Sequence, residues 1–214
     1  MSKLNMEGQE LRDYIDLSAS IIEPDIEDIY ITKRLLTQDG MSEEDVDSFI
    51  GAKIREHDKY FSAMDDEEYN EYVSDEKDRI FEEMAKAQEE AGPDGDASPR
   101  ARALAELRDV DLEHMPSLAE MMLANLNIID GKVKQVMFIK RGMEQVGIDP
   151  TDIAFAITDS AKEFDERFMK MPQDEFDEYM FNKILGRLLG EDIPMELADG
   201  DEVLIPGEDP LSAA

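Results

Sequence analysis

The chain of 214 residues carries 54 acidic and 22 basic residues, which gives a formal net charge of −32. It contains no cysteine, so disulfides, thiol catalysis and Cys-ligated zinc are excluded. The negative charge argues against direct binding to nucleic-acid phosphates or anionic lipid, and it favours a protein partner with a basic surface.

The first half of the chain shows apolar residues at helical spacing between short stop signals. We predict a helix over residues 9–20 and a break at Pro24, because proline disturbs a helix interior. A second helix then runs towards Gly40, a residue that accepts the left-handed conformation past a helix end. Ser42 predicts the N-cap of a third helix, and a fourth follows Asp65.

The second half repeats this order of signals. A proline opens its first helix, an Asp-Gly pair is expected to break that helix, and a glycine ends the next one. An Asp-Pro pair then predicts an N-cap with proline in the first helical turn, and another proline starts the last helix. The residues that mark these predicted boundaries are Pro116, Gly131, Gly147, Asp149, Pro172 and Gly190.

Two stretches lack a sustained helical pattern. Glycine and proline gather after residue 91, which predicts a linker with a short helix starting at Ser98. The C-terminal stretch is an extended acidic tail, whose apolar run Val203-Leu204-Ile205 packs back on the body or docks on a partner. The chain is thereby divided into a first helical unit, a linker with a short helix, a second helical unit and a tail, over residues 1–91, 92–112, 113–190 and 191–214.

The two halves are also similar residue by residue. Residues 128–179 align with residues 21–72 at a shift of 107 positions without a gap, and 15 of the 52 positions are identical. Such a repeat is typical of a duplicated architecture. We therefore predict an all-α fold, an internal duplication of a three-to-four-helix unit with an irregular C-terminal tail. The units either pack with approximate two-fold symmetry or sit as beads on the linker.

A basic pair recurs in this acidic chain: Lys33-Arg34 returns as Lys140-Arg141. We expect each pair to bridge to carboxylates of a neighbouring helix within its own unit. The alternative is a small anion site in each copy.

The repeated carboxylates and the two histidines each have a structural and a functional interpretation. Glu56 and Asp58 recur as Glu163 and Asp165, and we expect solvated faces and salt bridges; the alternatives are acid/base chemistry or a hard-cation site. His57 aligns with a phenylalanine, Phe164, which predicts a partly buried core position. The other histidine, His114, is expected to be exposed.

The best-kept segment reads Glu-Tyr-Asn-Glu-Tyr in the first copy and Glu-Phe-Asp-Glu-Tyr in the second. Its aromatic residues are three apart, which predicts a packing face, and the alternative is a duplicated docking surface for a basic partner. No catalytic, metal or cofactor residue is assigned, and no cofactor is expected. The candidate partner-binding residues are Glu68, Glu71, Tyr72, Glu175, Glu178, Tyr179, Val203, Leu204 and Ile205.

A short run in the second copy resembles a known family. Residues 171–179, Met-Pro-Gln-Asp-Glu-Phe-Asp-Glu-Tyr, are similar to the acidic C-terminal helices of phage tail assembly chaperones. The resemblance implies a helical protein with a role in assembly, and it assigns a role to none of the nine residues.

These observations favour a non-enzymatic, acidic interaction module: an adaptor, an assembly chaperone or a structural accessory of a larger complex, with viral complexes among the candidates. Its partner is expected to have a basic surface and to be symmetric or multi-subunit. A polyanion mimic that occupies a nucleic-acid-binding protein is the first alternative, and a divalent-cation-dependent enzyme is the second. A halophilic adaptation would also explain the charge, although lysine is about as common as arginine.

The expected location is the cytoplasm, or an intracellular or virion assembly. The start of the chain lacks the apolar core of a signal peptide. No apolar run approaches the roughly 18 residues that cross a bilayer, so we expect no membrane partner.

Overall fold

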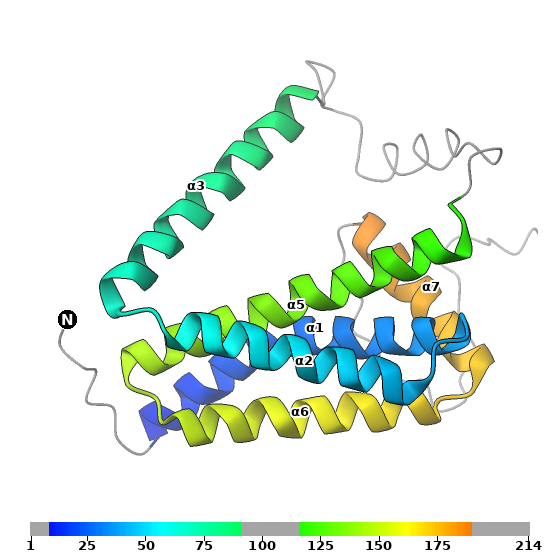
Figure 1. Ribbon diagram of the computed structural model, residues 1–214, viewed down its shortest axis with the longest axis horizontal. Coiled ribbons are helices and arrows are strands. Elements are labelled where there is room, and N and C mark those ends of the chain that lie inside the picture. The colour runs from blue at the N-terminus through cyan, green and yellow to red at the C-terminus, as the bar shows by residue number, and fades with distance from the viewer. Residues whose placement is uncertain (1–8, 91–115, 190–214) are drawn as a thin grey trace, which may run out of the picture.

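The computed structural model describes residues 9–90 and 116–189, which form six helices and no strand (Figure 1). An all-helical fold is thereby confirmed for this part of the chain. The predicted short helix after Ser98, His114 and the tail from residue 191 lie outside the described residues. The helices are α1 (Gln9–Gln38), α2 (Glu43–Ser62), α3 (Asp66–Glu90), α5 (Leu118–Val146), α6 (Pro150–Lys170) and α7 (Gln173–Leu189).

Two predicted breaks are wrong. Pro24 lies inside α1, and Gly131 lies inside α5. Residues on both sides of each position are deeply buried, Ile22 and Ile26 in α1 and Ile129 and Val133 in α5. A helical glycine costs only about 1 kcal/mol, which burial of these side chains outweighs. Packing also keeps α1 helical past Pro24, so each predicted pair of short helices is one long helix.

Four other boundary signals are confirmed, and the predicted end at Gly190 lies outside the described residues. Gly40 and Gly147 adopt positive φ angles of 100° and 101°, the left-handed conformation that ends α1 and α5. Ser42 caps α2 by accepting a hydrogen bond from the Asp45 amide, and Asp149 caps α6 by accepting one from the Thr151 amide. The chain therefore turns where its sequence marks the turns.

Four helices form the body, and α3 projects from one end of it (Figure 1). The central pair is α1 and α5, which run in opposite directions. The outer helices cross over: α6 packs mainly on α1, and α2 packs mainly on α5. Each outer helix thus covers the central helix of the other half of the chain.

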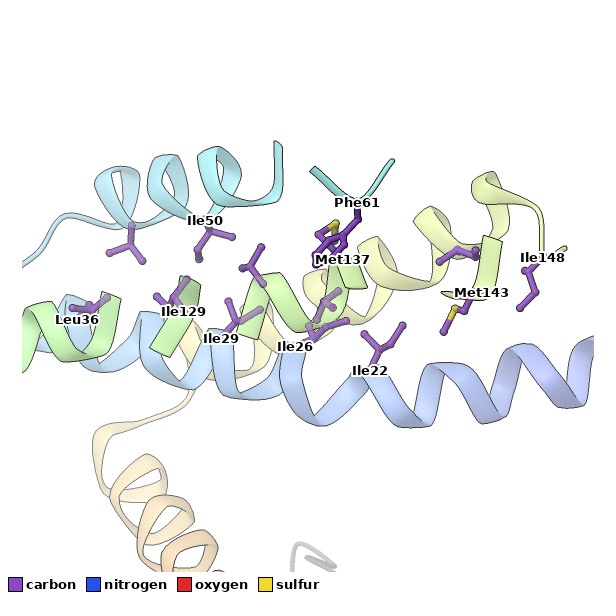
Figure 2. Packing of buried hydrophobic residues seen from close by; sticks show 14 residues of the cluster. Ile22, Ile26, Ile29, Leu36, Ile50, Phe61, Ile129, Met137, Met143 and Ile148 are labelled. Atoms are coloured by element: carbon purple, nitrogen blue, oxygen red, sulfur yellow. The ribbon is translucent and has the colours of Figure 1, made fainter. Parts of the chain in front are cut away.

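The main hydrophobic cluster draws on both halves (Figure 2). Its buried members come from α1, α2, α5, the turn after α5 and the start of α6, so the two halves share one core and are not beads on a linker. Several buried positions are related by the shift of 107. These pairs are Ile22/Ile129, Ile26/Val133, Ile29/Val136, Leu36/Met143, Val46/Ile153, Phe61/Phe168 and Tyr69/Phe176.

Candidate functional site

The repeated basic pairs hold the two halves together. Lys33 is fully buried, and its ammonium group lies 2.7 Å from Asp165 of α6 and 2.6 Å from Asp47 of α2. Lys140 lies 2.5 Å from Asp58. The bridges Lys33–Asp165 and Lys140–Asp58 each join one half to the other, whereas Lys33 also pairs with Asp47 and Glu43 of α2 in its own half. The prediction of bridges to a neighbouring helix of the same unit is therefore confirmed for Lys33 but incomplete, because the crossed-over helices add a carboxylate of the opposite half.

The environment of Lys33 keeps it charged. Burial by itself lowers the pKa of a lysine, but the hydrogen bonds to Asp165 and Asp47 outweigh it and raise the pKa of Lys33 to about 12. Burial also lowers the pKa of Lys140, and its bonds to Asp58 and Glu144 again produce a net increase. These cations already have internal carboxylate partners, which argues for an architectural role rather than an anion site.

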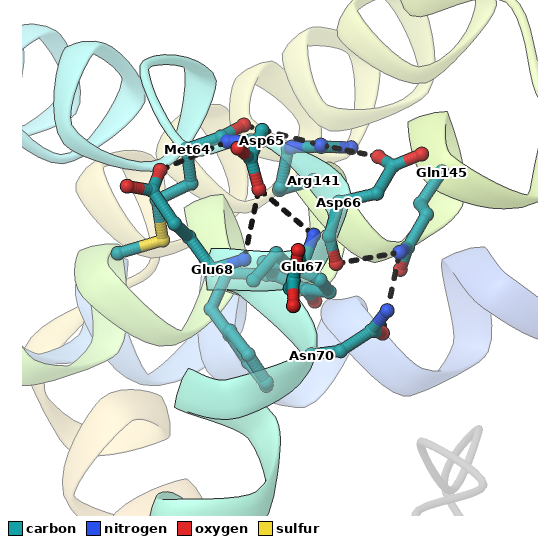
Figure 3. Close-up of polar contacts among 10 residues, drawn as sticks. Met64, Asp65, Asp66, Glu67, Glu68, Asn70, Arg141 and Gln145 are labelled. Atoms are coloured by element: carbon teal, nitrogen blue, oxygen red, sulfur yellow. Dashed lines mark hydrogen bonds and ion pairs between the residues drawn. The ribbon is translucent and has the colours of Figure 1, made fainter.

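Each arginine of the repeated pairs fixes the turn that precedes a third helix. Arg141 donates to the Met64 carbonyl and to Asp66 at the start of α3 (Figure 3). Arg34 donates to the carbonyls of Met169 and Met171 before α7. Positions 64 and 171 are related by the shift of 107, so the two halves fix the start of α3 and α7 by the same device.

The start of α3 is capped within its own segment. The Asp65 side chain accepts hydrogen bonds from the amides of Glu67 and Glu68, and Glu68 in turn accepts one from the Asp65 amide (Figure 3). This reciprocal arrangement is a capping box. Glu68 therefore has a structural role as well as an exposed carboxylate.

The repeated aromatic segment separates into buried rings and exposed acids. Tyr69 and Phe176 are buried, and so is Tyr179, whose hydroxyl donates to Glu27. Burial, followed by the neighbouring Glu27 carboxylate, raises the pKa of Tyr179. Tyr179 therefore belongs to the packing of α7 on α1 and is not free to dock. Four predicted docking carboxylates are exposed: Glu68, Glu71, Glu175 and Glu178.

Tyr72 has a different position from Tyr179. It is half-buried and lines a groove of about 550 Å³ between α3 and α5. Both polar and apolar side chains line this groove. Its lining includes Glu76, Arg79 and Ile80 of α3, and Ile128, Lys132, Lys134 and Phe138 of α5.

The groove is unusual in charge for so acidic a chain. Three cations, Arg79, Lys132 and Lys134, line it with one carboxylate, Glu76. The ammonium group of Lys134 lies 5.6 Å from the centre of the Tyr72 ring. Its hydrogen bond to Tyr72, reinforced by the nearby Glu76 carboxylate, raises the pKa of Lys134. The spacing of the sequence did not single out Lys134, because no local motif marks it.

The remaining sequence predictions fall outside the groove. His57 is partly buried, as predicted, and its Nε2 atom lies 2.7 Å from Asp130, a contact that the sequence analysis missed. Asp130 also pairs with Lys53. Glu163 is exposed on α6, and Glu56 pairs with Lys53 on the surface of α2. Val203, Leu204 and Ile205 lie outside the described residues.

Two broader features were tested on residues 9–90 and 116–189. No group of three or more histidines or carboxylates in these ranges is arranged to hold a metal ion. None of the helices described there is long and apolar enough to cross a membrane.

No family model matches the chain, and no curated protein or solved structure matches it either. The fold itself defines the class of the protein as an all-helical body, built from both halves of the chain, with one projecting helix. The similarity of residues 171–179 to phage tail assembly chaperones rests on that run alone.

Proposed function

We propose that the chain is an internally duplicated, non-enzymatic interaction protein that presents two acidic faces to a basic, symmetric or multi-subunit partner. The observation that carries the proposal is the sorting of the repeated segment: its rings pack inwards while its acids point to solvent. Glu68 and Glu71 at the start of α3 are exposed, and so are Glu175 and Glu178 at the start of α7. The two sets occupy positions related by the shift of 107.

The shared scaffold supports a pair of faces at a fixed separation. Reciprocal bridges from Lys33 and Lys140 join the halves, and Arg34 and Arg141 fix the turns before the acidic helices. Two rigidly held faces bind a partner with two basic patches more tightly than either face alone, because the second contact is intramolecular. An adaptor, an assembly chaperone or a structural accessory of a larger complex, viral complexes included, uses such a surface.

The test removes the acids without disturbing the packing. The variant Glu71→Gln/Glu175→Gln/Glu178→Gln keeps Glu68, which caps α3. In a pull-down from lysate of its source cells, the immobilised native chain should retain a partner protein. The immobilised triple variant should fail to retain that partner. A matched control, Asp152→Asn/Asp159→Asn/Glu163→Gln, neutralises three exposed acids of α6 and should retain it.

The identity and release of the partner separate the alternatives. A subunit of a larger assembly, retained by both acidic faces, supports the proposal. A nuclease, polymerase or repressor that competing DNA displaces supports a polyanion mimic instead. Retention that is equal for the native chain and the triple variant contradicts the acidic faces as the binding surface.

A further inference from the structure

The α3–α5 groove is the open counterpart of the closed contact between α7 and α1. In the closed contact, Lys183 of α7 lies 2.5 Å from Glu27 and 3.0 Å from Asp28 of α1. The shift of 107 relates Glu27 to Lys134 and Lys183 to Glu76, so the charges are exchanged between the two places. In the α7–α1 contact, the lysine of α7 is therefore paired with carboxylates of α1.

The groove lacks an acidic partner for one of its cations. Glu76 is paired with Arg79, and Lys132 is paired with Asp25 and Asp28 across the body. Lys134 contacts the Tyr72 ring, and no carboxylate of the described residues lies within ion-pair distance of it. A segment that fits the groove therefore needs a carboxylate for Lys134.

The same groove lacks an apolar cover. Ile80 of α3 and Ile128 of α5 line it and are each 46% exposed, and Phe138 lines it as well. Burying these apolar side chains under a bound segment stabilises the complex through the hydrophobic effect. The fitting segment therefore needs aliphatic side chains beside its carboxylates.

We propose that this groove binds the C-terminal segment of the same chain, residues 199–206. The tail from residue 190 contains eight acidic and no basic residues. Asp201 and Glu202 precede the aliphatic run Val203-Leu204-Ile205, which is the composition that the groove requires. The carboxylates neutralise Lys134 at the rim, and the aliphatic run covers the exposed isoleucines.

The length of the tail permits this contact. The last helix ends at Leu189, and the 13 residues from 190 to 202 reach about 45 Å when extended. The longest body helix beside the groove, α5 with 29 residues, measures about 44 Å. A tethered segment also has an effective concentration in the millimolar range, so a weak contact is well populated.

The docked tail covers apolar surface that otherwise promotes non-specific association. The inference does not depend on the acidic faces of α3 and α7, and it can fail while the proposed function stands.

The absence of cysteine allows a single label to test the inference in the full chain. The substitution Ala198→Cys carries a nitroxide, and nuclear magnetic resonance follows the backbone amides of the ¹⁵N-labelled protein. The amide signals of Ile80, Ile128 and Gln135 should lose intensity relative to the reduced label. The signals of Phe155 and Asp159, on the exposed side of α6, should not.

Charge variants then test the stated chemistry. Asp201→Asn/Glu202→Gln, which leaves the helical body untouched, should abolish the intensity loss in the groove, and so should Lys134→Glu. The control Lys170→Glu, at an exposed position of α6, should leave the loss unchanged.

A mixed sample identifies the source of the tail. Unlabelled nitroxide-bearing chain is combined with ¹⁵N-labelled chain that has no nitroxide. Intensity loss in the groove of this mixture would assign the occupant to a second copy and overturn the proposal. Unaffected groove signals, or an equal loss in the tail variant, would overturn it as well.

Discussion

The third helices of the two halves begin alike and end differently. Both α3 and α7 start at a turn held by an arginine of the other half, and both bury an aromatic residue in the first turns, Tyr69 or Phe176. Thereafter α7 stays on the body, where Tyr179 and Lys183 reach Glu27. In contrast, α3 projects from the body (Figure 1). Together with α5 it lines an open groove.

This difference teaches that two similar stretches of sequence need not pack equally closely on the body. One acceptor and two donors satisfy each other at α7, and burial there makes the contact stable. At α3 a lysine, Lys134, stands at the position that corresponds to Glu27, and its ammonium group contacts the Tyr72 ring. The structural role of the segment is thus conserved in its first turns and open to a new role beyond them.

The largest effect is expected from separating the halves. Because the main cluster draws on α1, α2, α5 and α6, an isolated fragment 1–95 or 96–214 exposes most of its core. Each fragment alone should lose most of its helical circular-dichroism signal, and mixing the two should restore it. A fragment that unfolds cooperatively by itself, with full helicity, would contradict the shared core.

The next effect compares two related core rings. Phe61→Ala and Phe168→Ala each remove a side chain that is at most 1% exposed, so each should reduce the free energy of unfolding by about 3–5 kcal/mol. Urea unfolding measures the loss. Phe155→Ala, at a position that is 73% exposed, is the control and should change it by less than about 0.5 kcal/mol. A large difference between Phe61 and Phe168 would show that the two places are not equivalent.

A smaller loss is expected at the bridges between the halves. Lys33→Met leaves Asp165 and Asp47 without their shared cation and should lower the free energy of unfolding by about 2 kcal/mol at pH 7. The corresponding substitution Lys140→Met should lower it by less, because Lys140 is less buried. The folded pKa of Lys33 is raised from 10.5 to about 12, so its contribution is fully present below pH 10.5 and disappears as pH rises through 12. Denaturant unfolding from pH 7 to 10 should show a constant difference, and a difference that falls within this range would contradict the assignment.

The Tyr69 side chain of α3 lies close to Gly142 of α5, where a larger residue has no room. A Cβ atom at Gly142 would lie 2.8 Å from the hydroxyl of Tyr69, which donates to the Phe138 carbonyl. Gly142→Ala should therefore destabilise the native chain by about 1 kcal/mol, although alanine is the better helix former. In a Tyr69→Phe background the same change should be neutral or stabilising. An identical effect in both backgrounds, measured by a double-mutant cycle, would contradict the steric coupling.

The smallest effect sharpens the contrast between α7 and α3. Tyr179→Phe removes the hydroxyl that donates to Glu27 in a buried contact, and it should cost about 1 kcal/mol. Tyr72→Phe removes a hydroxyl at the rim of the groove and should cost less than about 0.5 kcal/mol. Thermal unfolding of the two variants provides the comparison, and equal losses would indicate that α3 is closed as firmly as α7.

Local signals predicted much of the fold. Gly40, Ser42, Gly147 and Asp149 mark helix ends because backbone conformation and capping act within a few residues. Pro24 misled the prediction, since its cost is local while the burial of Ile22 and Ile26 that outweighs it is tertiary.

The candidate site was less predictable. The repeated acids and rings identified the right helices, but the spacing could not tell Tyr72 at a groove from Tyr179 in a buried contact. Lys134 and Lys183 escaped notice because their significance depends on groups that are distant in the sequence. Arg34 and Arg141 were singled out as a repeat, and only their partners were misjudged.

By itself, the sequence determined the helical class, the helix boundaries at Gly40, Ser42, Gly147 and Asp149, and the similarity of the halves. Hydrophobic spacing, caps and glycine conformations are properties of neighbouring residues, which is why the sequence alone predicts them. The tertiary structure decided which half each outer helix covers, and it thereby chose Asp165 for Lys33 and Asp58 for Lys140. It also closed one third helix and left the other open, since charge pairing across the body depends on residues more than 100 positions apart, as the Lys183–Glu27 ion pair with its separation of 156 positions illustrates.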